Sequence, residues 1–405
     1  MAGNPLSNVD VRYKVEVTPG TPVTGSSGEM FRIQPGQGLQ MQRGLIEDPE
    51  SRKDGQRSMA RLGAKSVTGS YPGTLSVGTF NTFLAALFRN TFAADAIALT
   101  CTGAGAYVSL ATTTGNTLTL IGSGSFLTQG VRVGDVIRVS AMGAGVDNVN
   151  AVVATVSALV ITALGTPWTN ITADTNAVLT IKKKLMNGAT LTRFAYTIEQ
   201  YYSDLDESEQ FTFCRVSSLR LTFQPNAVVK VEFGIVAQTM AILGTATSPG
   251  LTSPTEYTSI GLVAVDALIA IAGVSIATVT GGELIFDLNA QGVEVVGSTL
   301  TPDIYEGPMK VTGQITAVRT ALTASHLARF LAETDNVELS LLFVEPDAAV
   351  PIDFVHFFLP RLKYLGDVGG LGGDGPIIET IPVYAAAKAT TAGYDAVTAT
   401  ISSSV

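Results

Sequence analysis

The residues of this chain that could carry chemistry are few and far apart. His326 and His356 have no nucleophile or carboxylate placed beside them in a pattern typical of acid–base or nucleophilic catalysis. Cys101 and Cys214 are 113 residues apart, which is neither a disulfide framework nor a metal-ligand spacing. We therefore expect structural roles for all four: a helix surface for His326, a strand for His356 and buried sites for both thiols.

Two short runs resemble ligand-binding motifs but lack what those motifs need. The glycine run 369–375 is followed by Pro376-Ile377-Ile378-Glu379, which has the pattern of a strand, whereas a phosphate-binding loop leads into a helix. Lys182-Lys183-Lys184 is too short for a nucleic-acid patch. We predict a loop between strands for the first run and the exit from a β-rich segment for the second.

The densest local charge is acidic. Asp204-Leu205-Asp206-Glu207 begins like a calcium-binding loop, but the glycine at the sixth position is missing and Arg215 occupies the twelfth. We interpret this segment as an exposed hairpin tip, and no metal or other cofactor is predicted. Such a cluster also suits a surface that repels DNA. Its members are Glu199, Asp204, Asp206, Glu207 and Glu209.

Composition narrows the function classes further. Charged residues make up only 15% of the 405 residues, and the formal net charge is −9, which disfavours tight binding to phosphate backbones. The most apolar stretch, 260–279, is interrupted by Asp266, so no membrane span is predicted. The first residues have no apolar core, and we expect synthesis in a cytoplasm. So little charge indicates a surface that is largely buried in an assembly.

Most of the sequence has the pattern of short strands, for example Thr117–Ile121, Ala151–Ile161 and Val337–Val344. Two helices are predicted, Thr79–Phe88 and Thr323–Glu333, each with its threonine as N-cap. Each carries one apolar stripe that must pack on a sheet. The stripe residues are Phe80, Phe83, Leu84, Leu87 and Phe88 in the first helix, and Leu327, Phe330 and Leu331 in the second.

The two helices belong to a predicted internal duplication. Val67-Thr68-Gly69 precedes the first helix and Val311-Thr312-Gly313 precedes the second, 244 residues later. Downstream, Ser218-Leu219-Arg220-Leu221 is similar to Arg361-Leu362-Lys363-Tyr364 at an offset of 143. The difference between these two offsets indicates that the first half carries about a hundred extra residues between its helix and its later strands. We predict a mainly β chain of two barrel or sandwich units, each with one flanking helix, and an inserted small β-domain.

The predicted boundaries follow from this arrangement. The first unit occupies residues 1–92 and 189–245, the inserted domain residues 93–188, and the second unit with a C-terminal tail residues 246–405. The segment from Arg43 to Arg61 is predicted to be a long mixed-charge loop, either solvated or ordered against a neighbouring subunit.

Several stretches resemble the major tail (tail tube) proteins of long-tailed bacteriophages. The run 67–87 is similar to a glycine-, leucine- and phenylalanine-containing pattern of that family, with Phe83 standing where the pattern has its first leucine. Residues 213–233 and Leu359-Pro360-Arg361-Leu362-Lys363 resemble two further family stretches, and 125–139 resembles the extra β-domain of some members.

The resemblance implies a structural virion protein, a siphovirus tail subunit that assembles with itself and is not an enzyme. Family rings of six units stack into a tube that conducts DNA during genome ejection, so a chain with two units would form a trimeric ring with pseudo-sixfold symmetry; a hexamer is the alternative. Tape-measure and tail-terminator proteins are implied partners. The five acids between 199 and 209 would face the lumen or a ring contact, the segment from Arg43 to Lys65 and both termini would join rings, and the inserted domain would decorate the outside.

A second hypothesis is a surface-binding protein, carbohydrate-binding or adhesin-like, that acts through the inserted domain. Sugar-binding sites usually present aromatic platforms. Residues 93–188 contain only three aromatic side chains of this kind, namely Tyr107, Phe126 and Trp168, which weakens this hypothesis.

Overall fold

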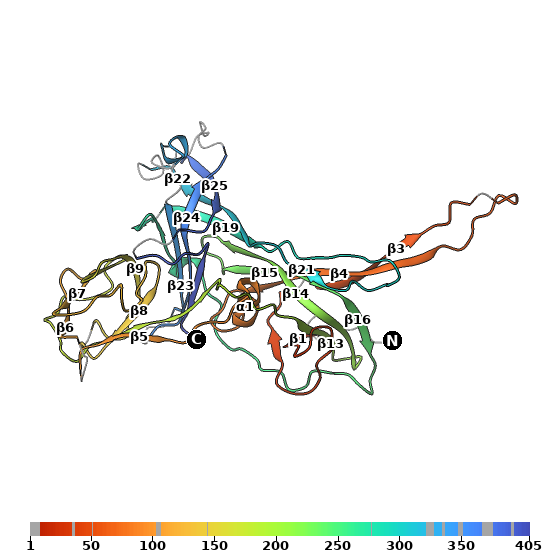
Figure 1. Ribbon diagram of the computed structural model, residues 1–405, viewed down its shortest axis with the longest axis horizontal. Coiled ribbons are helices and arrows are strands. Elements are labelled where there is room, and N and C mark those ends of the chain that lie inside the picture. The colour runs from red at the N-terminus through yellow and green to blue at the C-terminus, as the bar shows by residue number, and fades with distance from the viewer. Residues whose placement is uncertain are drawn as a thin grey trace.

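The structure is a computed structural model that describes residues 9–34, 37–50, 52–102, 107–143, 145–276, 278–320, 328–333, 337–346, 351–366, 376–389 and 393–405. As predicted, the chain is mainly β. One extended sheet system carries most of the strands, and a separate seven-stranded sheet lies at one end of the molecule. A long hairpin projects from the opposite end (Figure 1).

Two sets of strands, one early and one late in the chain, build the extended sheet. The early set is β1 (Val9–Val15), β2 (Glu29–Phe31), β3 (Leu39–Ile46), β4 (Arg61–Thr74), β13 (Tyr196–Tyr202), β14 (Glu207–Phe223), β15 (Lys230–Ala237) and β16 (Thr239–Leu243). The late set is β17 (Leu268–Ile271), β18 (Val274–Ser275), β19 (Val279–Asp287), β22 (Lys310–Val318), β23 (Val337–Val344), β24 (Phe354–Tyr364), β25 (Ile378–Ala385) and β26 (Thr400–Ser403). A 3-10 turn, η2 (Ala264–Asp266), precedes the late set.

The two sets repeat the same antiparallel pairings in the same chain order. The early pairings are β1–β2, β1–β13, β3–β4, β4–β15, β13–β14, β14–β15 and β14–β16. The late pairings are β17–β18, β17–β23, β19–β22, β22–β25, β23–β24, β24–β25 and β24–β26. Seven matching pairings are the structural counterpart of the repeat predicted from the sequence.

The strand register corrects one predicted offset. Cys214 lies opposite Tyr196 in the early set, and Leu362 lies opposite Val337 in the late set. β14 and β24 therefore correspond at an offset of 148 residues, and the predicted 143 is wrong. A β-bulge between Val216 and Ser218 shifts the pairing of β14. Because side chains alternate between the two faces of a strand, the extra residue changes which alternate residues face the core beyond the bulge.

Gly69 and Gly313, the glycines of the two Val-Thr-Gly motifs, occupy equivalent sites. Gly69 lies opposite Leu39 on β3, and Gly313 lies opposite Leu284 on β19. A Cβ atom added to Gly69 would lie 2.2 Å from the carbonyl oxygen of Gly38, and one added to Gly313 would lie 2.3 Å from that of Glu283. Both motifs thus require glycine because a neighbouring backbone approaches closely.

The first predicted helix forms α1 (Asn81–Phe88), between β4 and the seven-stranded sheet. All five residues of its predicted stripe are buried, and Phe83 stacks on Tyr196 with ring centroids 5.2 Å apart. The predicted N-cap is wrong: the cap position is Phe80, without a side-chain hydrogen bond. The Thr79 hydroxyl instead lies 2.7 Å from that of Ser76.

The second predicted helix is described only in part. Residues 328–331 are helical, and Leu327 lies outside the described residues, as do Thr323 and His326. Phe330 packs at the edge of the main core. Leu331 is 74% exposed, so this stripe residue does not contribute to packing within a single chain.

One hydrophobic core connects the two sets of strands. Phe88 of α1 lies 6.2 Å from Phe286 of β19, and Phe223 of β14 lies 6.0 Å from Phe343 of β23, measured between ring centroids. Both sets contribute to a single cluster of buried side chains. The two halves are thus fused through their interiors as well as through their strands.

Residues 96–181 form the seven-stranded sheet, which has its own hydrophobic core. Its strands are β5 (Ala96–Thr100), β6 (Ser109–Thr112), β7 (Thr117–Ile121), β8 (Val136–Ser140), β9 (Ala151–Val156), β10 (Val160–Ala163) and β11 (Val178–Ile181). The segment Ala151–Ile161, predicted as one strand, is the β9–β10 hairpin with a turn at 157–159. The next strand, β12 (Lys183–Met186), leaves this sheet and pairs with β26.

Candidate assembly surfaces

The β3–β4 hairpin continues into a projecting segment, residues 43–65, which we call the first arm (Figure 1). The predicted loop begins too early, because β3 runs to Ile46 and β4 resumes at Arg61, with these two residues opposite each other. The described residues between them form no strand or helix.

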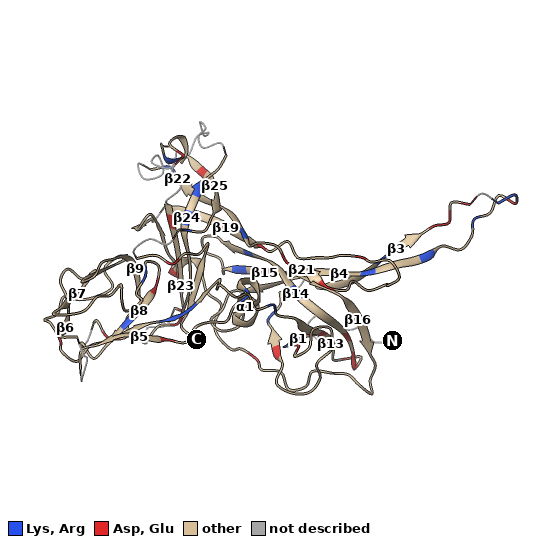
Figure 2. Ribbon diagram, in the orientation of Figure 1, with Lys and Arg blue, Asp and Glu red and all other residues tan. Residues whose placement is uncertain are grey.

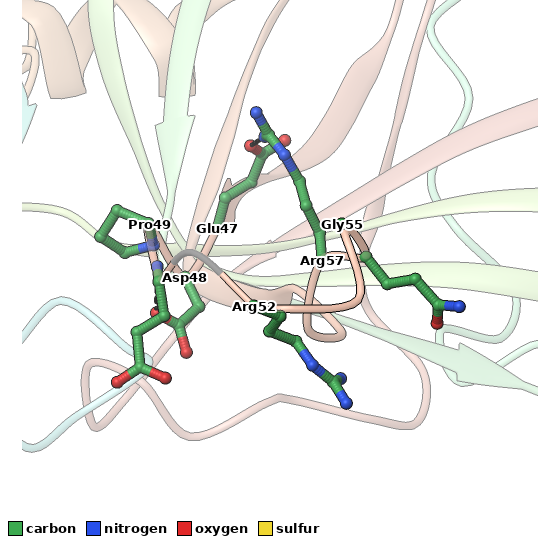
Figure 3. Close-up of a pocket in the computed structure, with 8 residues that line it drawn as sticks. Glu47, Asp48, Pro49, Arg52, Gly55 and Arg57 are labelled. Carbon is green, nitrogen blue, oxygen red and sulfur yellow. Dashed lines mark hydrogen bonds and ion pairs between the residues drawn. The ribbon is translucent and has the colours of Figure 1, made fainter.

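The tip of the first arm carries exposed charged side chains. Arg57 lies beside Glu47, with an Nη1–Oε2 distance of 2.8 Å, while Arg52 points away from this pair (Figure 3). Arg52 forms its own ion pair with Asp54 at 3.3 Å. Because these side chains are exposed, the pairs add little to stability. Charges of both signs lie along the arm (Figure 2).

The base of the first arm exposes apolar side chains. Leu45 and Leu62 lie directly opposite each other on the two strands, and they are 62% and 56% exposed. Ile46 is 60% exposed beside them. Single exposed apolar residues are common, but a cross-strand pair on a projecting hairpin forms a continuous apolar surface without a partner in the described part of the chain.

The late set of strands carries an equivalent segment, residues 288–309, which we call the second arm. It contains the short strands β20 (Gln291–Gly292) and β21 (Ile304–Tyr305). The pair Gln291–Tyr305 in the second arm occupies the position of the pair Ile46–Arg61 in the first. By this register Ala290 corresponds to Leu45, and Glu306 corresponds to Leu62.

Unlike the first arm, the second arm lies on the early set of strands. Its Ala290 and Ile304 are buried against Ala195 and Phe213. The Leu288 amide donates a hydrogen bond to the Ser217 carbonyl at 2.8 Å.

Buried charges hold the second arm in place as well. Glu306 forms an ion pair with Arg215 at 3.1 Å, and both side chains are only 4% exposed. Beside it, the partly exposed Arg193 reaches Asp303 at 3.0 Å. Removing one partner of the buried pair Arg215–Glu306 would leave an uncompensated charge, so this pair fixes where the arm lies.

A strand pairing continues this contact between the two halves. The end of β14 pairs antiparallel with β19, from Ser218 opposite Asp287 to Phe223 opposite Gly282. β19 therefore has a neighbour on each side, β22 and β14. Its counterpart β3 pairs only with β4 in the part of the chain that the structure describes. We call the contact formed by the β14–β19 pairing and the second arm the internal joint.

The five predicted acids divide into two groups. Glu199 is fully buried on β13, and its carboxylate accepts hydrogen bonds from the amides of Gly250 and Leu251 at 2.8 and 2.7 Å. The other four lie at the β13–β14 turn or on the first residues of β14, at the end of the body from which the first arm projects (Figure 1). They are Asp204, Asp206, Glu207 and Glu209.

The lysine run 182–184 anchors the seven-stranded sheet to the body. Lys184 Nζ lies 2.5 Å from Asp135 and 2.7 Å from Asp395, and the Asp135 side chain is 1% exposed. Burial disfavours the charged ammonium, but the two carboxylates outweigh it and raise the pKa of Lys184. Lys182 pairs with Asp95. These roles were not predicted, because Asp135 and Asp395 are distant from Lys184 in the chain.

Further contacts make this attachment close. Arg138 and Asn150 both donate hydrogen bonds to the Ile352 carbonyl, at 2.7 and 2.8 Å. Val136 of the seven-stranded sheet is buried with Leu342 and Phe354 of the late set. The aromatic side chains of this sheet do not form an exposed platform: Phe126 and Trp168 are 0% and 4% exposed, and Tyr107 packs against the core.

Both cysteines are buried, as predicted, and His356, predicted only to lie in a strand, is buried as well. His356 lies on β24, and its Nε2 is 2.7 Å from the Ser340 hydroxyl. Among the described residues, no group of three or more histidine, cysteine, aspartate or glutamate side chains is arranged to hold a metal ion. No helix in the described ranges is long and apolar enough to cross a membrane.

Acid should destabilise the fold through His356. Burial lowers the pKa of His356 to about 3, so below pH 6.5 the unfolded chain binds a proton that the folded chain does not, and stability falls as the pH decreases. The loss from this group is about 3 kcal/mol at pH 4. We expect the His356→Gln variant, which can retain the bond to Ser340, to lose that much less between pH 7 and pH 4 in chemical denaturation. Equal losses in both proteins would contradict this assignment.

Comparison with known proteins agrees with these observations. A search of curated proteins gave no match. The family described as "Phage tail tube protein" matches residues 7–385, which include the whole early set of strands, the late set except β26, both arms and the seven-stranded sheet. Because the match spans nearly the whole chain, this protein belongs to the phage tail tube protein family, a structural component of the virion tail.

Proposed function

We propose that three copies of this chain close into a ring, and that rings stack into the tube through which phage DNA passes into the host. The observation that carries this proposal is the repetition of seven strand pairings within one chain. If one chain supplies two of the six units that the resemblance implies, three chains complete the ring with pseudo-sixfold symmetry.

The domain organisation follows from the same repeat. We assign residues 1–92 and 189–245 to the first tube unit, 93–188 to an inserted domain and 246–405 to the second unit with its tail. The inserted domain decorates the outside of the tube. Its attachment through Lys184 and through Ile352 supports a fixed orientation.

The first arm and the acidic hairpin tip serve the contact between rings. Both lie at the same end of the body (Figure 1), and Asp204, Asp206, Glu207 and Glu209 lie at that tip. The net charge of −9 supports passage of DNA without adhesion. Glu199, which is buried, is better explained as a structural residue. Tape-measure and tail-terminator proteins would meet the two ends of the tube, and the subunits are made in the host cytoplasm.

Electron microscopy of the purified protein tests this function. We expect rings or tubes with a central pore. Threefold-averaged images should show six similar units around the pore and three peripheral domains outside them. Mass photometry of single rings should give three times the chain mass of 42.1 kDa. A ring of six chains would contradict the trimer, and a protein that stays monomeric under all assembly conditions would contradict the tube.

A further inference from the structure

The internal joint shows how one unit of this protein receives the next. β14 of the early set lies beside β19 of the late set, and the second arm covers Phe213 of β14, Val236 of β15 and the adjacent Ala195. The joint combines backbone hydrogen bonds, an apolar contact at Ala290 and the buried ion pair of Glu306 with Arg215. It is continuous with the shared core.

The early set presents the same elements without a partner. The outer edge of β3, the counterpart of β19, has no strand beside it in the described residues. Leu45 and Leu62 are exposed at the positions of Ala290 and Glu306, which are both buried in the internal joint. An open strand edge beside an apolar pair is a site for adding a further strand.

The late set presents the matching receiving face. At the offset of 148, Lys363 corresponds to Arg215 and Tyr384 to Val236. Leu365, whose amide bonds to the Pro382 carbonyl, takes the place that Ser217 and Ser218 share at the bulge of β14. Leu365 and Tyr384 are 40% and 38% exposed, whereas Val236 is partly buried under the second arm. Exposed apolar side chains thus lie on this face as well as on the first arm. A second copy of the same chain supplies both surfaces, which argues against an unrelated partner.

We propose that the contact between chains copies the internal joint: the outer edge of β3 and the base of the first arm bind the β24–β25 face of a second copy, with Arg43 opposite Leu365. This inference rests on the ring proposed above and specifies its contact and register. The first arm then binds a neighbour within its own ring through its base, and only its polar tip extends towards the next ring.

Disulfide trapping tests the register. Directly opposite residues in an antiparallel pair have Cα atoms 4.5–5.5 Å apart, which suits a disulfide. The double variant Arg43→Cys/Leu365→Cys, assembled and then oxidised, should link most chains into covalent dimers and trimers on non-reducing denaturing gels. Reductant should reverse the ladder. The native cysteines are buried and should not contribute.

The chain provides a matched control. Ser218 and Asp287 are opposite each other in the internal joint, so Ser218→Cys/Asp287→Cys should form a disulfide within each chain and no ladder. Each single-cysteine variant of the test pair should give no trimer. Rings or tubes that form normally but do not cross-link at Arg43 and Leu365 would overturn this inference and leave the tube function intact. Failure of the unmodified protein to form rings would overturn both.

Discussion

We expect the double variant Leu45→Asp/Leu62→Asp to remain monomeric under conditions in which the unchanged protein forms rings and tubes. Both side chains are more than half exposed in the single chain, so the substitutions should not lower its thermal midpoint. In an assembled ring, each contact would lose the burial of two leucines, worth about 1.5–3 kcal/mol apiece. Two carboxylates would also lose their hydration.

A leucine outside the proposed contact provides the control. Leu159, in the β9–β10 turn, is 44% exposed, and Leu159→Asp should assemble as the unchanged protein does. Sedimentation velocity and negative-stain microscopy read out assembly for all three proteins. Tubes formed by the double variant at unchanged protein concentration would show that the arm base lies outside the contacts of the ring.

Much of the scaffold could be predicted because its signals are local. The stripe from Phe80 to Phe88 has the period of a helix, and any helix with that stripe must cover a sheet. The two Val-Thr-Gly motifs marked equivalent strands correctly because each glycine meets a backbone carbonyl at the same place in its unit. The helix stripe and the three-residue motifs can both be recognised from residues that are close together in the sequence.

The errors arise where distant residues decide the outcome. The predicted offset of 143 aligned Leu219 with Leu362, and both side chains are buried. The alignment misled because the bulge after Val216 changes which alternate residues of β14 face the core. The alternation of apolar and polar residues in the sequence cannot reveal such a bulge. Residues 43–46 of β3 were assigned to the predicted loop because a strand exposed on both faces has no apolar period, and only its pairing with β4 creates it.

The candidate surfaces were harder to predict than the fold. Glu199 was grouped with the acids of the hairpin tip because it is near them in sequence, yet its place on β13 turns it into the interior, where it binds the backbone at 250–251. The lysine run gave no usable signal, because its partners are 49 residues (Asp135) and 211 residues (Asp395) away from Lys184. Such contacts depend on how separate sheets pack.

Those lysine contacts predict a second large effect. Lys184→Met should remove the only ammonium that the described structure places between Asp135 and Asp395. Asp135 would remain buried with the Arg132 amide as a neutral donor at 2.8 Å. Breaking a buried ion pair from one side costs about 3–5 kcal/mol, so we expect a loss of that size in the free energy of unfolding of the unassembled chain.

Lys183→Met is the matched control, because it removes a lysine from the next position, whose side chain forms no ion pair among the described contacts. It should unfold within about 0.5 kcal/mol of the unchanged protein. Because Lys184 connects β12 to a turn of the seven-stranded sheet and to the C-terminal segment, its loss should also make that sheet move relative to the body. Microscopy of Lys184→Met tubes should then show intact rings with blurred peripheral density. Equal stability of the two methionine variants would mean that Asp135 is neutralised in another way and that the ion pairs do not anchor the domain.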